Sequence, residues 1–315
     1  MWNEKLKQID RVLIPKLAVE RWAGDLNSIQ LISEGVNLVY RFEINHQGHY
    51  LRLTHSELRP INQLEAAVNF QNYLSQSGVS ICALVQSCHQ NYIEKIMDRD
   101  AVFLAQVCQE VSGRPIDFNN PNLNLYQHWG RVLGEFHKAS LNYLPGIHQN
   151  IYASVDKSFD ELKGYLDSEP SEIKNLLESV ISYFSTRPRT ALNFGLTHGD
   201  HREGNVITDG SKINIIDFDL PCFNWFTEDL FRPFFNSWVD GNTQFEKVFK
   251  FYLDGYFSVM LKESIDLESF PWHLKLKGLE IYLWTKNSWD LDSEAPGGGN
   301  AREWLAKIYK KLTEA

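Results

Sequence analysis

The order of the predicted elements is the feature that most restricts how this chain can fold. Before about residue 107 the pattern is mainly that of strands, with one helix predicted at 61–75, where apolar residues recur at i, i+3 and i+4. The predicted strands are short runs rich in β-branched and aromatic residues, at 29–32, 38–44, 49–53, 81–85 and 101–107. After residue 112 the spacing becomes helical, with helices predicted at 125–139, 155–166 and 171–184. This order predicts an α+β, bilobal fold with a small N-terminal β-rich lobe (residues 1–107) and a larger, mostly helical C-terminal lobe (residues 108–315).

A strand-turn-strand unit interrupts the helical half. Residues 205–208 and 213–217 are predicted strands on either side of the turn Asp209-Gly210. Helices are predicted from there to the end, with breaks at Pro271 and at 296–299. Because a hairpin folds the chain back on itself, we expect the residues just before and just after it to lie close together.

Charge and composition exclude several classes of protein. The 315 residues include 31 Lys plus Arg against 40 Asp plus Glu, a net charge of −9. An acidic balance argues against nucleic-acid binding and against docking on anionic membranes, both of which rely on an excess of basic residues. With 43% hydrophobic and 23% charged residues the chain is not intrinsically disordered. We expect a soluble globular protein with neither nucleic acid nor membrane as a partner.

The termini and the cysteines indicate a compartment. No apolar segment follows the first charges after Met1, so we expect no signal peptide, and no run of 18 apolar residues predicts a membrane span. The four cysteines form no C-x-x-C pair and are too few for a disulfide framework. We expect a cytoplasmic protein.

The stretch from His198 to Asn205 carries the strongest chemical signal. Within it Asp200 precedes Asn205 by five residues, and Asp217 follows the next apolar strand. Phosphoryl transfer needs one carboxylate that orients or deprotonates the attacking hydroxyl, and an Asn and a second Asp that hold Mg²⁺ on the ATP phosphates. Protein kinases carry these groups in H-R-D-x-x-x-x-N and D-F-G, with the same five-residue step. The spacing therefore predicts Asp200 as the catalytic residue and Asn205 and Asp217 as magnesium ligands.

Each of these three residues has an ordinary structural explanation when it is taken alone. The two aspartates could cap a loop or end a strand, and Asn205 could occupy a turn. Jointly, the spacing, the flanking apolar strands and the β-rich lobe upstream favour the kinase site. We interpret His198 as a structural histidine that fixes the loop, and no partner is predicted for His137 or His201.

The two motifs, His-Gly-Asp with an asparagine five residues on and then Ile-Asp-Phe-Asp, resemble those of the aminoglycoside phosphotransferase and choline kinase superfamily. The resemblance covers about residues 28–235. It implies a protein-kinase-like fold and transfer of the γ-phosphate of Mg·ATP to a hydroxyl of a small molecule. It also implies that Arg52 lies on the strand that binds the nucleotide phosphates, that Glu65 on the following helix is its partner, and that Asp229 braces the catalytic loop.

The resemblance also places the adenine at the hinge between the lobes. There residues 106–110, including Gln106, would offer backbone N–H and C=O groups to the base, with Cys108 nearby. Gly35 lies in the loop expected to cover the phosphates, and it is the one glycine of residues 33–37, where protein kinases use G-x-G-x-x-G.

Two further residues depart from the pattern of the family. Arg52 stands where many members have Lys; a guanidinium can still bind phosphate and pair with Glu65, or it could form a surface ion pair on an exposed strand. Asp219 stands where D-F-G has its glycine, and it either assists a second metal ion or caps the next turn.

The identity of the phosphate acceptor is left open by the sequence. Glu280, Trp284, Trp289, Asp290 and Asp292 mix aromatic faces with carboxylates, a combination that suits a cationic amine or a quaternary ammonium group. The competing interpretation is that the tryptophans are helix-packing core and the acids a solvated face. Aminoglycosides, amino alcohols and homoserine-like compounds are the acceptors considered.

Three other functions compete with a small-molecule kinase. Arg52 and the glycine-poor loop motivate a catalytically silent, kinase-fold nucleotide-binding protein, and a kinase acting on protein Ser or Thr is a further alternative. The neighbouring His198, Asp200 and His201 suggest a metal-dependent phosphoesterase, but no second D-x-H or H-x-H motif supplies the further ligands that a two-metal site needs. The presence of all three predicted catalytic and metal-binding residues favours the active kinase.

Overall fold

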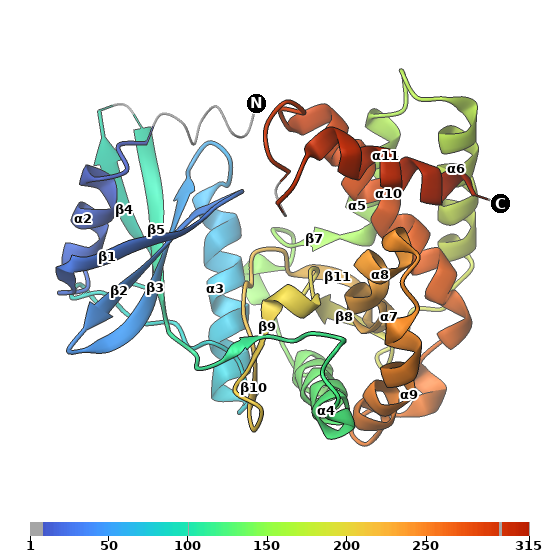
Figure 1. Cartoon of the computed structure of the whole chain (residues 1–315), viewed down its shortest axis with the longest axis horizontal. Helices are drawn as coiled ribbons and strands as arrows, with labels where there is room; N and C mark the ends of the chain where they lie inside the picture. Colours follow the sequence, from blue (N-terminus) through green and yellow to red (C-terminus); the bar gives the residue numbers. More distant parts are fainter. Residues whose placement is uncertain (1–8, 100, 296–297, 315) are drawn as a thin grey trace.

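The computed structural model describes residues 9–99, 101–295 and 298–314, and it has two lobes joined after the last strand of the smaller one (Figure 1). The small lobe contains α2 (Leu13–Glu20), β1 (Asp25–Glu34), β2 (Leu38–Ile44), β3 (Gln47–His55), α3 (Ile61–Gln76), β4 (Glu94–Asp98) and β5 (Ala101–Gln109). The predicted α+β, bilobal fold is confirmed.

The large lobe is mostly helical. Its helices are α4 (Leu123–Ser140), α5 (Val155–Gly164), α6 (Ser171–Ser185), α7 (Phe226–Phe231), α8 (Phe235–Asp240), α9 (Gln244–Phe257), α10 (Phe270–Ser288) and α11 (Ala301–Thr313). Its short strands are β6 (Arg114–Pro115), β7 (Ala153–Ser154), β8 (Phe194–Thr197), β9 (Val206–Thr208), β10 (Ile213–Ile215) and β11 (Cys222–Trp225). Among the described helices, none is both long enough and apolar enough to cross a membrane.

The small lobe is built on an antiparallel sheet with the strand order β1-β2-β3-β5-β4. Alternate residues of β2 and β3, such as Leu38 and Leu51, are fully buried and share a hydrophobic core with Ile14 of α2. Directly opposed residues lie on one face of a sheet, so Arg52 of β3 and Gln106 of β5, which are paired, share the opposite face. Helix α3 lies between this sheet and the large lobe (Figure 1).

Three features of the small lobe differ from the prediction. Helix α2 and strand β4 were not predicted; β4 carries Glu94, whose carboxylate is buried among polar partners, so it lacks a plain apolar alternation. Residues 81–85 do not form a strand, because their partners lie in different lobes: Ile81 bridges to Ile215, whereas Leu84 bridges to Cys108. The segment therefore ties the hinge strand to the hairpin of the large lobe.

The predicted hairpin is present as β9 and β10, which pair antiparallel. Asn205 precedes β9, and the N–H of Ile216, just after β10, donates to the carbonyl of Asn205 over 2.9 Å. As expected, the hairpin brings the residues before and after it together. Pro271 does not break a helix; it lies in the first turn of α10, where its missing N–H has no helical acceptor to lose. The predicted break at 296–299 lies partly outside the described residues.

Helices α4 and α9 approach each other with their backbones in contact. A Cβ at Gly130 of α4 would lie 1.8 Å from the carbonyl oxygen of Tyr252, and one at Gly255 of α9 would lie 1.8 Å from that of Gln127. No larger residue fits at either position, so the two glycines set the spacing of the two helices.

Candidate active site

Asp200 lies in the loop that follows β8, and both oxygens of its carboxylate are engaged. Oδ1 forms an ion pair with Arg232 Nη2 at 2.6 Å, and Oδ2 accepts from Arg202 Nε at 3.2 Å and from Asn205 Nδ2 at 3.1 Å. Partial burial by itself raises the pKa of Asp200, but the positive charges of Arg232, Arg202 and Lys277 outweigh it and hold the pKa below its ordinary value. The carboxylate is therefore ionised and fixed in orientation.

Asp229, at the start of the large lobe's α7, supports this loop from inside the protein. It is fully buried, and it accepts the backbone N–H of His198 at 2.6 Å and that of Gly199 at 3.0 Å. Burial disfavours its charge, yet the hydrogen bond with His137 and the neighbouring histidines lower its pKa well below the ordinary range. The predicted bracing of the loop by Asp229 is confirmed.

His198 and Gly199 fix the path of the loop. The N–H of Asp200 donates to His198 Nδ1 at 3.3 Å, which leaves Nε2 to carry the proton and donate to the carbonyl of Ile216 at 3.0 Å. The structural role predicted for His198 is thus confirmed. Gly199 has φ +80°, and a Cβ there would lie 1.9 Å from the carbonyl oxygen of Leu220, so only glycine fits.

The two histidines without a predicted partner both have one. His137 Nδ1 lies 2.8 Å from the Tyr256 hydroxyl, and its Nε2 lies 3.2 Å from Asp229. His201 Nε2 accepts from Trp129 Nε1 at 2.9 Å, and burial lowers the pKa of His201 to about 3, so its ring is neutral. The position of His137 on the apolar face of the predicted helix 125–139 was a signal of burial that the sequence offered.

A group of charged and polar residues connects the two lobes. Arg52 Nη2 donates to Asp217 Oδ1 at 2.9 Å and also to Asp219. Arg59, in the linker before α3, donates to the carboxylate and to the carbonyl oxygen of Asp219. Asn37 Nδ2 donates to Asp219 at 2.7 Å. We call these five residues the interlobe cluster; the ordering of Asp219 by two arginines is a contact that sequence reasoning missed.

Charge and backbone conformation distinguish the two aspartates of this cluster. Burial raises the pKa of Asp219, but Arg52 and Arg59 outweigh it, so the net pKa is lowered. Asp217 adopts φ +69°, a left-handed conformation that is uncommon for a residue with a side chain. It immediately follows the hairpin whose other end carries Asn205.

Glu65 is not where the resemblance implies. It lies on the exposed side of α3, and within the described part of the chain no ion pair joins it to Arg52, whose partners are Asp217 and Asp219 instead. The buried residues of α3, such as Leu64 and Ala67, occupy the side that packs against the protein, which leaves Glu65 facing solvent. Gly35 lies in the β1–β2 loop, where its N–H donates to the carbonyl of Asn37 at 3.1 Å.

The backbone of Gln106 and Cys108 is already paired within the sheet, which corrects the expected hinge. Arg52 and Tyr50 of β3 are their partners on one side of β5. On the other side, Val107 accepts from the N–H of Val85 at 2.9 Å, and the N–H of Gln109 donates to Ala83 at 2.9 Å. The N–H of Glu110 is also paired, with the carbonyl of Gly48 at 3.0 Å. Backbone groups for a base are therefore expected at residues 111–113, beside a pocket of about 460 Å³ formed with residues 47–50. The side chains of Gln106 and Cys108 still share the face of Arg52.

The residues proposed for acceptor binding separate into two groups. Glu280 pairs with Lys277 at 2.7 Å, and Lys277 also pairs with Glu228 at 2.8 Å and lies 3.4 Å from the carbonyl of Gly199. Burial, only partly offset by Lys277, raises the pKa of Glu228 to about 8. Glu280 thus belongs to the surroundings of the catalytic loop.

The other four residues of that set lie apart from the loop. Trp289 is buried, stacks at a tilt with Trp284 and donates its Nε1–H to a backbone carbonyl, and Asp292 forms an exposed ion pair with Arg302. Asp290 accepts a backbone N–H within the same turn. For the tryptophans, the packing interpretation is confirmed.

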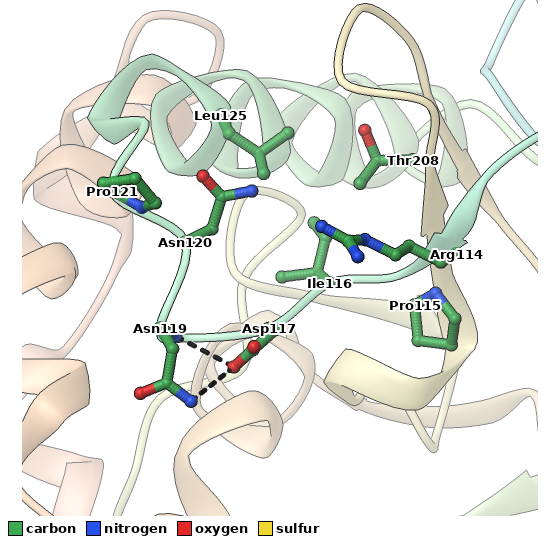
Figure 2. A pocket seen from close by; sticks show the side chains of 9 residues that line it. All are labelled: Arg114, Pro115, Ile116, Asp117, Asn119, Asn120, Pro121, Leu125 and Thr208. Carbon is green, nitrogen blue, oxygen red and sulfur yellow. Dashed lines mark hydrogen bonds between the residues drawn. The ribbon is translucent and has the colours of Figure 1, made fainter.

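A second, smaller pocket of about 280 Å³ lies beside the linker that leaves the hinge (Figure 2). Its lining comes from residues 114–117 and 119–121, Leu125 of α4 and Thr208 of β9, so it is separate from Asp200 and Asp217. Asp117 accepts from the N–H and the side-chain amide of Asn119, which holds the linker in shape.

The small lobe contains an antiparallel sheet, and the large lobe is mostly helical. An ionised carboxylate lies in a braced loop that precedes a hairpin. This is the arrangement of a kinase-fold phosphotransferase. The chain belongs to the phosphotransferase enzyme family (APH), whose model matches residues 28–261. It is similar to the amicoumacin kinase of Bacillus subtilis (strain 168), with 23% identity over 306 residues that cover 94% of this chain and 90% of the relative. The homoserine kinase of Methylobacillus flagellatus is 22% identical, over 82% of this chain and 79% of that protein.

Solved structures share the fold. The amicoumacin kinase hAmiN in complex with AMP-PNP, Ca²⁺ and Ami has a TM-score of 0.83 at 21% identity, over 99% of this chain and 96% of that one. A microcompartment-associated aminopropanol kinase has a TM-score of 0.73 at 17% identity, over 96% and 95% of the two chains. The likeness extends over both lobes.

Proposed function

We propose that this enzyme transfers the γ-phosphoryl group of Mg·ATP to a hydroxyl of a small molecule, with Asp200 as the catalytic residue. The observation that carries the proposal is the carboxylate of Asp200, held ionised by Arg232 and fixed by Arg202 and Asn205. An oriented, ionised carboxylate can accept the hydrogen bond of an incoming hydroxyl and take its proton as the O–P bond forms. The silent-protein alternative has less support, since Asp200, Asn205 and Asp217 are all present.

Asn205 and Asp217 would hold the magnesium ion. Both supply oxygen donors, which Mg²⁺ prefers, and they stand at the two ends of one hairpin. The described residues include no group of three or more His, Cys, Asp or Glu side chains placed to hold a metal, and Mg²⁺ in kinases takes further ligands from the nucleotide phosphates. The ion would neutralise charge on the phosphates, while Arg52 would release Asp217 and bind phosphate.

An acceptor that carries an amino group fits the surroundings of Asp200. Glu228 and Glu280 flank Lys277 beside the catalytic loop, and Glu228 Oε2 is buried with no hydrogen-bond partner among the described residues. A buried carboxyl oxygen without a partner favours a ligand that forms a hydrogen bond with it. Two of the related kinases are named for aminopropanol and homoserine, both amino alcohols. We therefore infer that the phosphate acceptor is an amine-bearing alcohol. A cytoplasmic location is also proposed, and the four free cysteines agree with it.

The test pairs a screen with two substitutions. ADP release is measured with Mg·ATP over amino alcohols, amino sugars and hydroxylated amino acids. Asp200→Asn should then lower single-turnover phosphorylation of the best acceptor on the order of 10²–10⁴-fold, with Mg·ATP affinity nearly intact, because Asp200 faces the hydroxyl. Asp217→Asn should weaken Mg·ATP binding and abolish transfer together, because Asp217 acts through the ion.

Calorimetric titration of Mg·ATP separates the two roles. If Asp200→Asn loses nucleotide affinity as badly as Asp217→Asn, the assigned roles are wrong. If both variants turn over normally, the site lies elsewhere in the chain.

A further inference from the structure

Two arginines of the small lobe converge on a single carboxylate of the large lobe. Arg52 contacts Asp219 Oδ2 and Arg59 contacts Asp219 Oδ1 and its carbonyl oxygen. The three side chains are largely buried, with 21%, 12% and 15% of their surface exposed for Arg52, Arg59 and Asp219. Both guanidinium groups therefore contact Asp219, and that of Arg52 also contacts Asp217, in the part of the interlobe region where the nucleotide phosphates are proposed to bind.

The donors of Arg52 are only partly used. Both of its ion pairs go through Nη2, and Nε is buried with no hydrogen-bond partner among the described residues. A guanidinium has five N–H donors in a fixed fork, and a buried donor without an acceptor is costly. Arg52 thus has N–H donors left for an oxygen-rich anion, on the same guanidinium group that Asp219 already orients.

Arg59 and Arg52 share the partner Asp219. Glu65 is exposed and forms no ion pair with Arg52 in the described part of the chain, and Asp219 from the large lobe orients both arginines. Mg²⁺ neutralises only part of the negative charge of a triphosphate, and guanidinium forks are well suited to the phosphate oxygens that remain.

We propose that Arg59 is a second phosphate-binding residue of the nucleotide site, which acts beside Arg52 and is held in place by Asp219. The inference rests on the proposed function, since it concerns the same nucleotide. Its specific consequence is that the contribution of Arg59 depends on the number of phosphates in the ligand. A residue that only clamps the lobes together would affect adenosine and ATP alike.

The experiment titrates adenosine, Mg·ADP and Mg·ATP calorimetrically into the whole protein and its variants. Arg59→Met should weaken Mg·ATP on the order of tenfold, because a charge-assisted bond to phosphate is lost, and should leave adenosine within about twofold. Arg59→Lys should recover part of the loss, since it keeps the charge without the fork. Arg189→Met, which removes an arginine paired with Asp156 away from the cluster, is the matched control and should change neither ligand.

Two results would overturn the proposal: equal losses of adenosine and Mg·ATP affinity in Arg59→Met, or no loss of either while the protein remains folded. If Arg59→Met does not fold, Arg59→Lys takes its place. A Mg·ATP affinity of Arg59→Lys equal to that of the unaltered protein would exclude a bidentate role for Arg59. Failure of the unaltered protein to bind adenosine and Mg·ATP would instead refute the proposed function, which keeps the two failures distinguishable.

Discussion

The catalytic loop and the interlobe cluster are built on opposite physical principles. The loop is fixed by hydrogen bonds to the fully buried Asp229, all within the large lobe. The interlobe cluster consists of ion pairs between largely buried side chains of different lobes, with Arg52 and Arg59 in the small lobe and Asp219 in the large lobe. Hydrogen bonds within one lobe are independent of how the lobes meet, whereas ion pairs between the lobes can be exchanged for a charged ligand. Under the proposed function, the acceptor side is preorganised and the nucleotide side is adjustable.

The largest effect is expected from removing Asp229, the buried carboxylate that anchors the catalytic loop. Asp229→Ala should lower the free energy of unfolding by about 3–5 kcal/mol, because it leaves two backbone N–H groups and His137 without their partner. The melting temperature should fall by roughly 5 °C or more in calorimetry. As a control, Asp156→Ala removes an exposed ion pair with Arg189 and should cost no more than about 1 kcal/mol. Equal losses in the two variants would contradict the assignment of Asp229 as an anchor.

Lowering the pH should destabilise the catalytic loop more than the ion pairs of the interlobe cluster. Burial holds the pKa of His201 at about 3, below its unfolded value of about 6.5, so the unfolded chain binds the extra proton between these pH values. Stability from the neutral His201 is complete above about pH 6.5 and decreases by about 1.4 kcal/mol per pH unit below it. In urea unfolding at several pH values, His201→Gln should show a shallower decrease, since its amide oxygen can still accept from Trp129.

The exposed His46 provides the control for this pH series. His46→Asn should keep the slope of the unaltered protein. An unchanged slope in His201→Gln would mean that other groups cause the acid sensitivity.

The smallest expected effect lies in the interlobe cluster. Asn37→Ala removes the 2.7 Å bond to Asp219 and the 2.5 Å bond from Thr54, and it should cost about 1–2 kcal/mol, because the buried Thr54 hydroxyl loses its acceptor while the arginines still hold Asp219. Differential scanning calorimetry should show a decrease of about 2–3 °C. A loss as large as that of Asp229→Ala would place the cluster among the permanent contacts of the core.

The same contrast explains what the sequence could predict. The catalytic loop is local: Asp200 and Asn205 are five residues apart, and a turn leads from one to the other, so their spacing together with the flanking apolar strands predicts them. The interlobe cluster joins Arg59 to Asp219 across 160 positions, and no local pattern encodes which side chain meets which. Glu65 was assigned by resemblance to a pair that the structure does not contain.

Backbone pairing set a second limit. The residues 81–85 have strand-like composition, but strand formation depends on a continuous partner, and theirs changes from the hairpin to β5 within four residues. The same pairing occupies the backbone of β5 up to Gln109 and shifts the expected base-binding groups along the chain. Amino-acid composition does not indicate which edge of a strand is paired with another segment.

The contact between α4 and α9 restricts how this enzyme can change over evolutionary time. Gly130 and Gly255 each face a carbonyl of the other helix, so a larger residue at either one pushes the whole pair apart. His137, two helical turns beyond Gly130, meets Tyr256, the neighbour of Gly255, and also holds the aspartate beneath the catalytic loop. A larger residue at either glycine would therefore displace the helix pair that holds His137 and, through it, Asp229. A change at one of these positions requires both helices to adjust together.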